Sequence, residues 1–219
     1  SVTGPALIRS AGGPLPTVAW QKAGEAPTYA LDGGVYAASS AINWAQGLGL
    51  FDGFDTINRF DADPAIGRGL AFVPALSGLA CPHWDRHARG AWMGLALDTT
   101  KGDMMQAVLE GVAFRMAEVV RVIEALQPLA RTVSIDGGLS ANPYFCAFLA
   151  DALNRDVIVS DEAELTAMGT AMLAAEAAGG GIDTPLQGQT IKTRGQPPAF
   201  QNRFRAARDA VQAYGTVSP

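Results

Sequence analysis

The chain has 219 residues, of which 48% are hydrophobic and 17% are charged, and its 16 Lys and Arg against 21 Asp and Glu give a net charge of −5. This composition suits a folded domain with a well-filled core and argues against intrinsic disorder. An acidic chain has no general attraction for nucleic acid or an anionic membrane, and no apolar run approaches the roughly 18 residues that span a bilayer.

The cysteines and the N-terminus indicate where the protein works. Cys81 and Cys146 lie far apart and form neither a disulfide framework nor a metal-type pair, so we expect a reducing, cytoplasmic location. No basic segment followed by an apolar core comes after Ser1, so we predict no signal peptide. Because an initiator Met is absent, we expect the chain to be part of a longer protein.

The first half of the chain predicts short strands and one helix. Residues 1–28 are rich in Gly and Pro and predict short strands joined by turns. Small and apolar residues over 35–44 permit a helix, which the following glycines end. The apolar runs 70–73 and 91–97 predict buried strands.

The second half alternates between strands and helices. A helix capped by Asp103 is predicted to run to residue 126, because its apolar residues recur at spacings of three and four. Further elements are predicted in this order: a strand over 132–135, a helix from Pro143 to about residue 153, a strand over 157–159 and a helix over 164–178. Residues 182–219 are predicted to be a linker and a C-terminal helix. The alternation indicates an α/β domain with a mixed sheet flanked by helices.

The segment from Asp136 through Gly137 and Gly138 to Asn142 carries the strongest functional signal. A strand ends, two glycines let the backbone turn and approach a ligand closely, and a helix begins. Free N–H groups at a helix N-terminus attract phosphate, and Asn142 can either cap the helix or offer its amide to a ligand. The plainer interpretation is a tight turn with an ordinary cap, which this short motif alone favours.

Two other segments are candidate sites. Asp32, Gly33 and Gly34 repeat the same motif, and with Ser39 and Asn43 on the following helix they predict a second, phosphate-facing edge; the alternative is a turn and a closely packed helix. His83 and His87 lie four residues apart but lack a recognised metal-ligand spacing. We therefore expect a packed, salt-bridged loop there and no metal site.

Residues 90–95 (GAWMGL) and 103–110 (DMMQAVLE) resemble the second signature of the FGGY carbohydrate kinases. Matching segments continue from about residue 29 to residue 179, and within the family the chain is most similar to the C-terminal domain of the glycerol kinases. The resemblance implies an actin-like (ribonuclease H-like) ATPase domain, with residues 1–219 forming a single C-terminal nucleotide-binding domain. In that family, two such domains close around ATP and a polyol.

The resemblance also implies roles for individual residues. Gly138 and Asn142, with Gly137 beside them, match positions that contact the adenosine part of ATP. Ser39 stands at a family glycine beside the phosphates, and Asn43 stands where a glutamine is common. Residues 81–83 read Cys-Pro-His where Ala-Pro-Tyr is usual.

The catalytic aspartate of the family lies in a Gly-Asp-Gln stretch upstream of this region, so we expect the general base upstream of Ser1. The resemblance implies ATP and Mg²⁺ as cofactors, the latter held mainly by an N-terminal part. It also implies a polyol or sugar substrate, a partner in the protein's own N-terminal domain and a possible homo-oligomer, with this part inactive alone. A non-catalytic actin-like module that binds a nucleotide or a protein partner is the alternative, and a nucleotide-dependent enzyme of another chemistry is the weakest candidate.

Overall fold

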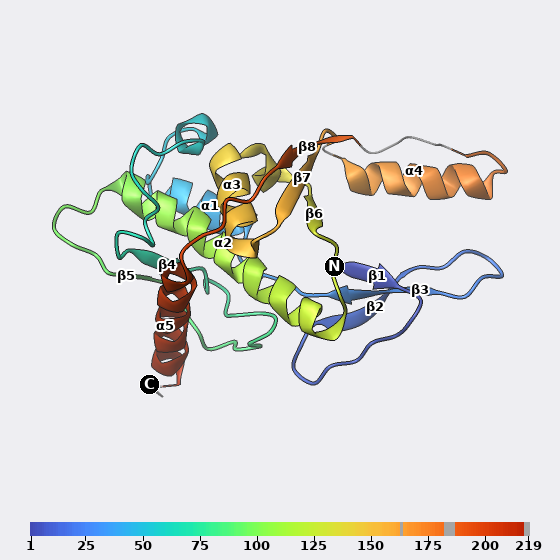
Figure 1. Ribbon diagram of the computed structural model, residues 1–219, viewed down its shortest axis with the longest axis horizontal. Coiled ribbons are helices and arrows are strands. Elements are labelled where there is room, and N and C mark those ends of the chain that lie inside the picture. The colour runs from blue at the N-terminus through green and yellow to red at the C-terminus, as the bar shows by residue number, and fades with distance from the viewer. Residues whose placement is uncertain (163, 182–186, 217–219) are drawn as a thin grey trace.

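The computed structural model describes residues 1–162, 164–181 and 187–216. Its central element is the long helix α2 (Lys101–Leu126), which crosses the molecule and is buried along most of its length (Figure 1). Gly111 of α2 faces β4, where a Cβ atom would collide with the carbonyl oxygen of Phe72, so glycine allows this close approach. No helix within these ranges is both long and apolar enough to cross a membrane.

The N-terminal residues form an antiparallel sheet, which confirms the short strands predicted for this region. β3 (Thr28–Asp32) lies between β1 (Val2–Gly4) and β2 (Leu15–Trp20). A second antiparallel pair joins β4 (Ala71–Val73) to β5 (Ala91–Met93). The strand predicted over 91–97 is therefore shorter than expected, since Gly94 adopts a φ of +86° directly after β5.

The third sheet carries the βαβ unit that positions the candidate site. β6 (Thr132–Ile135) and β7 (Asp156–Ser160) are parallel, and α3 (Pro143–Leu153) connects them after the short 3₁₀ helix η2 (Gly138–Ala141). β8 (Gly188–Ile191) adds an antiparallel edge to β7. The mixed sheet flanked by helices confirms the predicted α/β fold class, but β8 corrects the linker prediction for part of 182–197. Residues 182–186 lie outside the described residues.

Two other helices flank the site. α1 (Ser39–Gly47) begins four residues later than predicted, and the 3₁₀ helix η1 (Phe54–Ile57) follows it. The ring of Trp44 of α1 stacks on the rings of Phe72 and Trp92, with centroid distances of 5.9 and 5.4 Å, and those two rings also contact each other. This aromatic cluster anchors α1 to the β4–β5 pair, because aromatic contacts bury large apolar areas.

The cap of α2 differs from prediction, and α4 lies apart from the core. Thr100, not Asp103, caps α2: its hydroxyl accepts from the backbone N–H of Asp103, whose carboxylate accepts from the backbone N–H of Thr100. This capping box places the acidic residue three positions inside the cap. α4 (Leu165–Ala177) confirms the helix predicted over 164–178, but in the described part of the chain it contains no buried residue and extends away from the body (Figure 1).

The C-terminal helix α5 (Pro198–Gly215) confirms the helix predicted at this end of the chain. It packs against the core through Phe204, Ala207 and Val211, and the ring of Phe204 stacks on that of Phe114 of α2 at 4.9 Å. Phe148 of α3 contacts the same Phe114, so α3 and α5 both pack on α2, although 44 residues separate them in the sequence.

Candidate functional site

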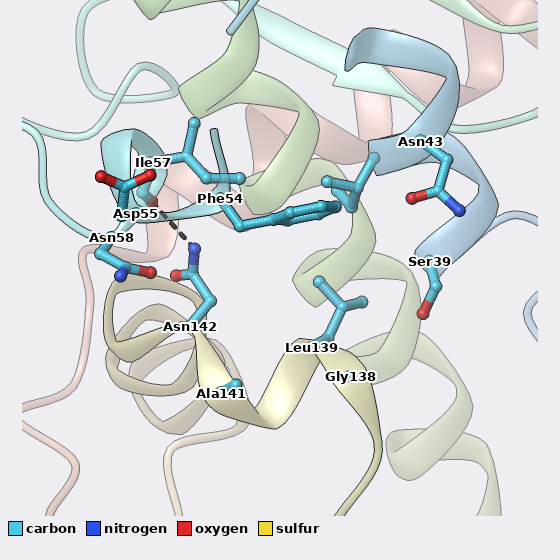
Figure 2. Close-up of a pocket in the computed structure, with 11 residues that line it drawn as sticks. Ser39, Asn43, Phe54, Asp55, Ile57, Asn58, Gly138, Leu139, Ala141 and Asn142 are labelled. Atoms are coloured by element: carbon cyan, nitrogen blue, oxygen red, sulfur yellow. Dashed lines mark hydrogen bonds between the residues drawn. The ribbon is translucent and has the colours of Figure 1, made fainter. Parts of the chain in front are cut away.

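A cavity of about 460 Å³ opens between α1, η1 and the start of α3 (Figure 2). Its size falls in the ~300–1,000 Å³ range of small-molecule sites. Eleven residues from these three parts of the chain line it: Ser39, Ile42, Asn43, Phe54, Asp55, Ile57, Asn58, Gly138, Leu139, Ala141 and Asn142. Four of the five residues singled out from the sequence, namely Ser39, Asn43, Gly138 and Asn142, therefore meet around one cavity.

Different structural features explain why glycine occupies each of the two positions after β6. Gly137 has a φ of +83°, a left-handed conformation that favours glycine, and it turns the chain from β6 into η2 without itself lining the cavity. Gly138 does line the cavity, and among the described residues nothing lies within 4 Å of the position that its Cβ would occupy. Open space at Gly138 is what a ligand that approaches the backbone requires.

Asn142 is a structural residue as well as a lining residue. Its side-chain oxygen accepts from the backbone N–H of Phe145 at 2.7 Å, which caps α3, and its Nδ2 donates to the carbonyl oxygen of Ile57 at 2.9 Å. The side chain is 7% exposed. The N-terminus of α3 is thus already capped by its own chain, which makes it a poor place for a phosphate.

The N-terminus of α1 offers the opposite situation. Ala38 precedes the helix, and within the described ranges no side chain caps it. Ser39 stands in the first turn and Asn43 one turn later, and both side chains lie on the side of the cavity away from Asp55 and Asn58 (Figure 2). A helix end without a side-chain cap keeps free N–H groups and a partial positive charge, which favours an anion.

The sequence did not predict that η1 forms one wall of the cavity. This wall consists of residues in and next to η1, a region for which the sequence predicted no helix or strand: Phe54, Asp55, Ile57 and Asn58. Phe54 is 55% exposed, and its ring meets that of Phe51 edge-on at 5.5 Å. The exposure of Phe54 is known only from the structure, so the sequence itself contained no signal that could have identified this wall.

The second glycine motif does not belong to the cavity. Gly33 lies so close to α2 that a Cβ atom would collide with Val119, which explains this glycine by packing. The part of the cavity wall that the structure describes includes none of Asp32, Gly33 or Gly34. The prediction of a phosphate-facing edge is therefore wrong for the Asp-Gly-Gly motif. Of the residues predicted to form this edge, only Ser39 and Asn43 line the cavity.

The histidine loop packs against a buried charge cluster. His83 Nε2 lies 3.4 Å from the carboxylate of Glu118, which also pairs with Arg115 and Arg208. Burial opposes ionisation of Glu118, but the hydrogen bond from His83 and the charges of Arg115 and Arg208 outweigh it and lower its pKa to about 2. Among the residues placed by the structure, no three His, Cys, Asp or Glu side chains form a group that could hold a metal ion.

The cavity has the chemistry of a nucleoside site more than that of a metal–phosphate site. Ile42, Phe54, Ile57 and Leu139 give apolar walls, and hydroxyl and amide groups provide hydrogen bonds at the edges. Asp55 is the one charged residue among the described lining residues, so this lining alone fits an adenosine group but does not form a Mg²⁺ site.

Comparisons with known proteins show which family the chain resembles. Residues 3–178 match the family model described as "FGGY family of carbohydrate kinases, C-terminal domain". A glycerol kinase of Citrifermentans bemidjiense is 39% identical over 169 residues, covering 76% of this chain and 34% of that protein. A glycerol kinase of Geobacter sp. (strain M21) is 35% identical over 195 residues, covering 88% of this chain and 39% of that protein.

Solved structures show the same fold. The crystal structure of Plasmodium falciparum glycerol kinase with ADP superposes with a TM-score of 0.76 at 23% identity, covering 99% of this chain and 44% of that one. This chain thus spans little more than a third of the length of the curated relatives it matches. On the strength of the family match over most of its residues, the chain belongs to the FGGY family of carbohydrate kinases and corresponds to their C-terminal domain.

Proposed function

We propose that residues 1–219 form the nucleotide-binding domain of an ATP-dependent kinase that transfers the γ-phosphate to a hydroxyl group of glycerol or a related polyol or sugar. The observation that carries the proposal is the single cavity shared by Ser39 and Asn43 of α1 and Gly138 and Asn142 beside α3. The glycerol kinase relatives support the choice of substrate class, and the structure of Plasmodium falciparum glycerol kinase with ADP supports the choice of nucleotide.

The two sides of the cavity suggest how the nucleotide is oriented. The base would lie toward η1, where Phe54 provides an aromatic face and Asn58 an amide, and Gly138 would leave room for the adenosine group. The phosphates would point toward Ser39 at the N-terminus of α1, which lacks a side-chain cap, and away from the carboxylate of Asp55 (Figure 2). Like charges would otherwise repel each other.

The charge of the triphosphate must be balanced elsewhere. None of the lining residues in the described part of the chain is Lys or Arg. Phosphoryl transfer depends on positioning and on neutralising the charge that spreads over the phosphate oxygens. We therefore propose that Mg²⁺ and an N-terminal domain complete the site, and that this domain supplies the general base and the polyol contacts.

Exposed apolar side chains on β2 and α4 fit contact with an N-terminal domain. Leu15 and Val18 on β2 are 57% and 52% exposed, and Leu173 on α4 is 48% exposed. The relatives are two to three times as long as this chain, so they contain enough sequence for another domain. Closure of such a domain over the cavity would exclude water and limit wasteful ATP hydrolysis.

Calorimetric titration of ATP and ADP onto the chain tests the nucleotide site. We expect weak binding by the unsubstituted chain and a clear loss in Gly138→Val and Asn142→Ala. Equal binding by all three proteins would show that the site is wrong. A coupled ADP-release assay of the full-length protein against glycerol, erythritol and several ketoses and pentoses then tests the activity, and this chain alone should show none.

A further inference from the structure

Glu110 of α2 is a buried carboxylate that lies outside the proposed nucleotide cavity. Its side chain is 1% exposed, and it is not among the described lining residues. Burying a carboxylate is unfavourable unless hydrogen bonds or an opposite charge compensate for the lost water. The groups that Glu110 contacts therefore show what holds it in the core and what it holds in turn.

Three donors from two parts of the chain meet at this carboxylate. Oε1 accepts from the backbone N–H of Ala65 at 2.8 Å, and Oε2 accepts from that of Ile66 at 2.8 Å. The hydroxyl of Tyr144 donates to Oε1 at 2.6 Å. Ala65 and Ile66 belong to the turn between η1 and β4, whereas Tyr144 stands in the first turn of α3. One side chain of α2 thus joins the two segments that lead to the η1 and α3 walls of the cavity.

The segment between η1 and this turn is fixed at two further points. The ring of Phe60 packs edge-on against that of Tyr144, with ring centroids 4.8 Å apart. The carbonyl oxygen of Asp63 accepts from Nε of Arg68 at 3.0 Å and from Nε2 of Gln106 at 3.3 Å. Because these contacts follow η1 so closely in the sequence, they transmit the position of the turn to the η1 wall.

Charged and titratable groups reach Glu110 from the turn and from α3. The guanidinium of Arg68 donates to Gln106 at 2.8 Å and pairs with Asp103 at 2.7 Å. Tyr144 keeps its proton, because burial and the charge of Glu110 raise its pKa. Burial raises the pKa of Glu110 to about 7, although the hydrogen bonds from Tyr144 and the backbone and the charge of Arg68 act in the opposite direction. Glu110 therefore changes its charge near neutral pH.

The two walls that Asn142 and Ile57 join at the cavity are thus joined a second time, outside it. We propose that Glu110 is a positioning residue of the nucleotide cavity: its carboxylate holds the turn after η1 against Tyr144 and keeps both walls in the arrangement that accepts a nucleotide. This inference rests on the proposed function. An ionised carboxylate accepts all three hydrogen bonds, whereas a neutral carboxyl group carries a donor on one oxygen. We therefore expect protonation of Glu110 to weaken nucleoside binding.

Hydrogen exchange of the ligand-free chain, measured by NMR, tests this coupling without any nucleotide. The reporters are the backbone N–H of Phe145 and the side-chain NH₂ of Asn142, which form the two bonds that fix the start of α3. In Glu110→Gln the new NH₂ group faces one of the three donors, so we expect both reporters to exchange at least about fivefold faster. Tyr144→Phe removes only the hydroxyl link and keeps the ring, and it should change the rates in the same direction.

Glu118→Gln is the control, because it removes another buried carboxylate of α2 whose partners, including His83 and Arg208, are not among the described lining residues. Once exchange is corrected for the global stability of each variant, Glu118→Gln should leave both reporters unchanged. Unchanged exchange in both Glu110→Gln and Tyr144→Phe overturns the inference, whether or not the chain binds nucleotide.

Titration with adenosine, which has no phosphate to titrate near neutral pH, separates positioning from stability. As the pH rises from about 6 to about 8, the ionised fraction of Glu110 rises from about one-tenth to about nine-tenths, so affinity should increase by up to about tenfold. Stability changes in the opposite direction: between pH 4.5 and about 7 the folded chain keeps a proton that the unfolded chain releases, so the contribution of Glu110 falls as the pH rises. A purely structural role would make affinity follow stability.

Glu110→Gln should abolish the pH dependence of adenosine affinity, and Glu118→Gln should retain it. Affinity that does not change with pH, or a pH dependence that survives in Glu110→Gln, overturns the inference. Absence of adenosine binding by the unsubstituted chain would instead refute the proposed nucleotide site, and the exchange rates would still decide whether Glu110 holds the two walls.

Discussion

The Nδ2 atom of Asn142 donates to the carbonyl oxygen of Ile57 at 2.9 Å across 85 residues of sequence. This bond joins the first turn of α3 to η1, so two walls of the cavity are held at a fixed separation. The same side chain caps α3 through Phe145. Asn142 thus links the local fold of one helix to the shape of the proposed nucleotide site.

Asn142→Ala removes both hydrogen bonds at once. We expect the free energy of unfolding to fall by about 2 kcal/mol, since a lost cap and an unpaired buried carbonyl each cost about 1 kcal/mol. Nucleotide affinity should fall as well. Urea unfolding and ATP titration measure the two effects. In Asn142→Asp the cap remains but the donor to Ile57 is lost, so a loss of affinity equal to that of Asn142→Ala would identify the Ile57 bond as the important one.

Gly138→Val tests the space beside the backbone. Because nothing described lies within 4 Å of a Cβ at this position, the substitution should change stability by less than about 1 kcal/mol. The valine side chain would occupy ligand space, so we expect at least about a tenfold loss of ADP affinity. Gly137→Ala is the contrasting variant: its φ of +83° makes any side chain strained, and it should lose stability first. Unchanged ADP affinity in Gly138→Val would contradict the proposed placement.

Phe54→Ala tests the orientation of the nucleotide. A base that stacks on an aromatic ring gains about 1–3 kcal/mol, so ADP affinity should fall about five- to 150-fold. Phe54→Tyr keeps the aromatic face and should retain the affinity. Since Phe54 is 55% exposed, both variants should unfold near the transition of the unsubstituted protein. If Phe54→Ala binds ADP normally, the base does not lie on η1.

Glu118 predicts a pH dependence of stability. Its pKa is about 2 in the folded protein against an ordinary 4.5, because the contacts from His83, Arg115 and Arg208 outweigh the effect of burial. A lowered acid pKa stabilises the fold above pH 4.5, and this contribution, up to about 3 kcal/mol, is lost as the pH falls from 4.5 toward 2. Urea unfolding across this range measures it.

Glu118→Gln should flatten the pH dependence between pH 4.5 and 2 and lower stability at pH 7, because it leaves the buried guanidinium of Arg115 without its counter-charge. Glu124→Gln is the control on the same helix. Its ion pair with Arg155 involves a 44% exposed carboxylate, so it should contribute less than about 1 kcal/mol. An equally steep acid transition in Glu118→Gln would show that other carboxylates control it.

Sequence patterns predicted the elements that depend on local signals. The Asn-Pro pair at 142–143 marked the start of α3, and the three- and four-residue spacing of apolar side chains marked α2. The two Asp-Gly-Gly motifs and the family resemblance identified Ser39, Asn43, Gly138 and Asn142 as site candidates, and the structure places them around one cavity. Their contact with a nucleotide remains a prediction.

Features that depend on tertiary contacts were not predictable in this way. β8 is short and polar, and its only reason to be a strand is the exposed edge of β7. Asp103 looked like a cap because it precedes the apolar stripe, yet the capping box placed Thr100 at that position. Gly33 looked like a ligand-binding glycine, and only the position of Val119 on α2 shows that packing explains it.

A crystal structure of the chain with bound ADP would test the central claim most directly. The account predicts density for the base against Phe54 and Leu139, with the phosphates directed toward Ser39 at the N-terminus of α1. Density for ADP outside the cavity between α1, η1 and α3, or phosphates placed beside Asp55, would contradict it.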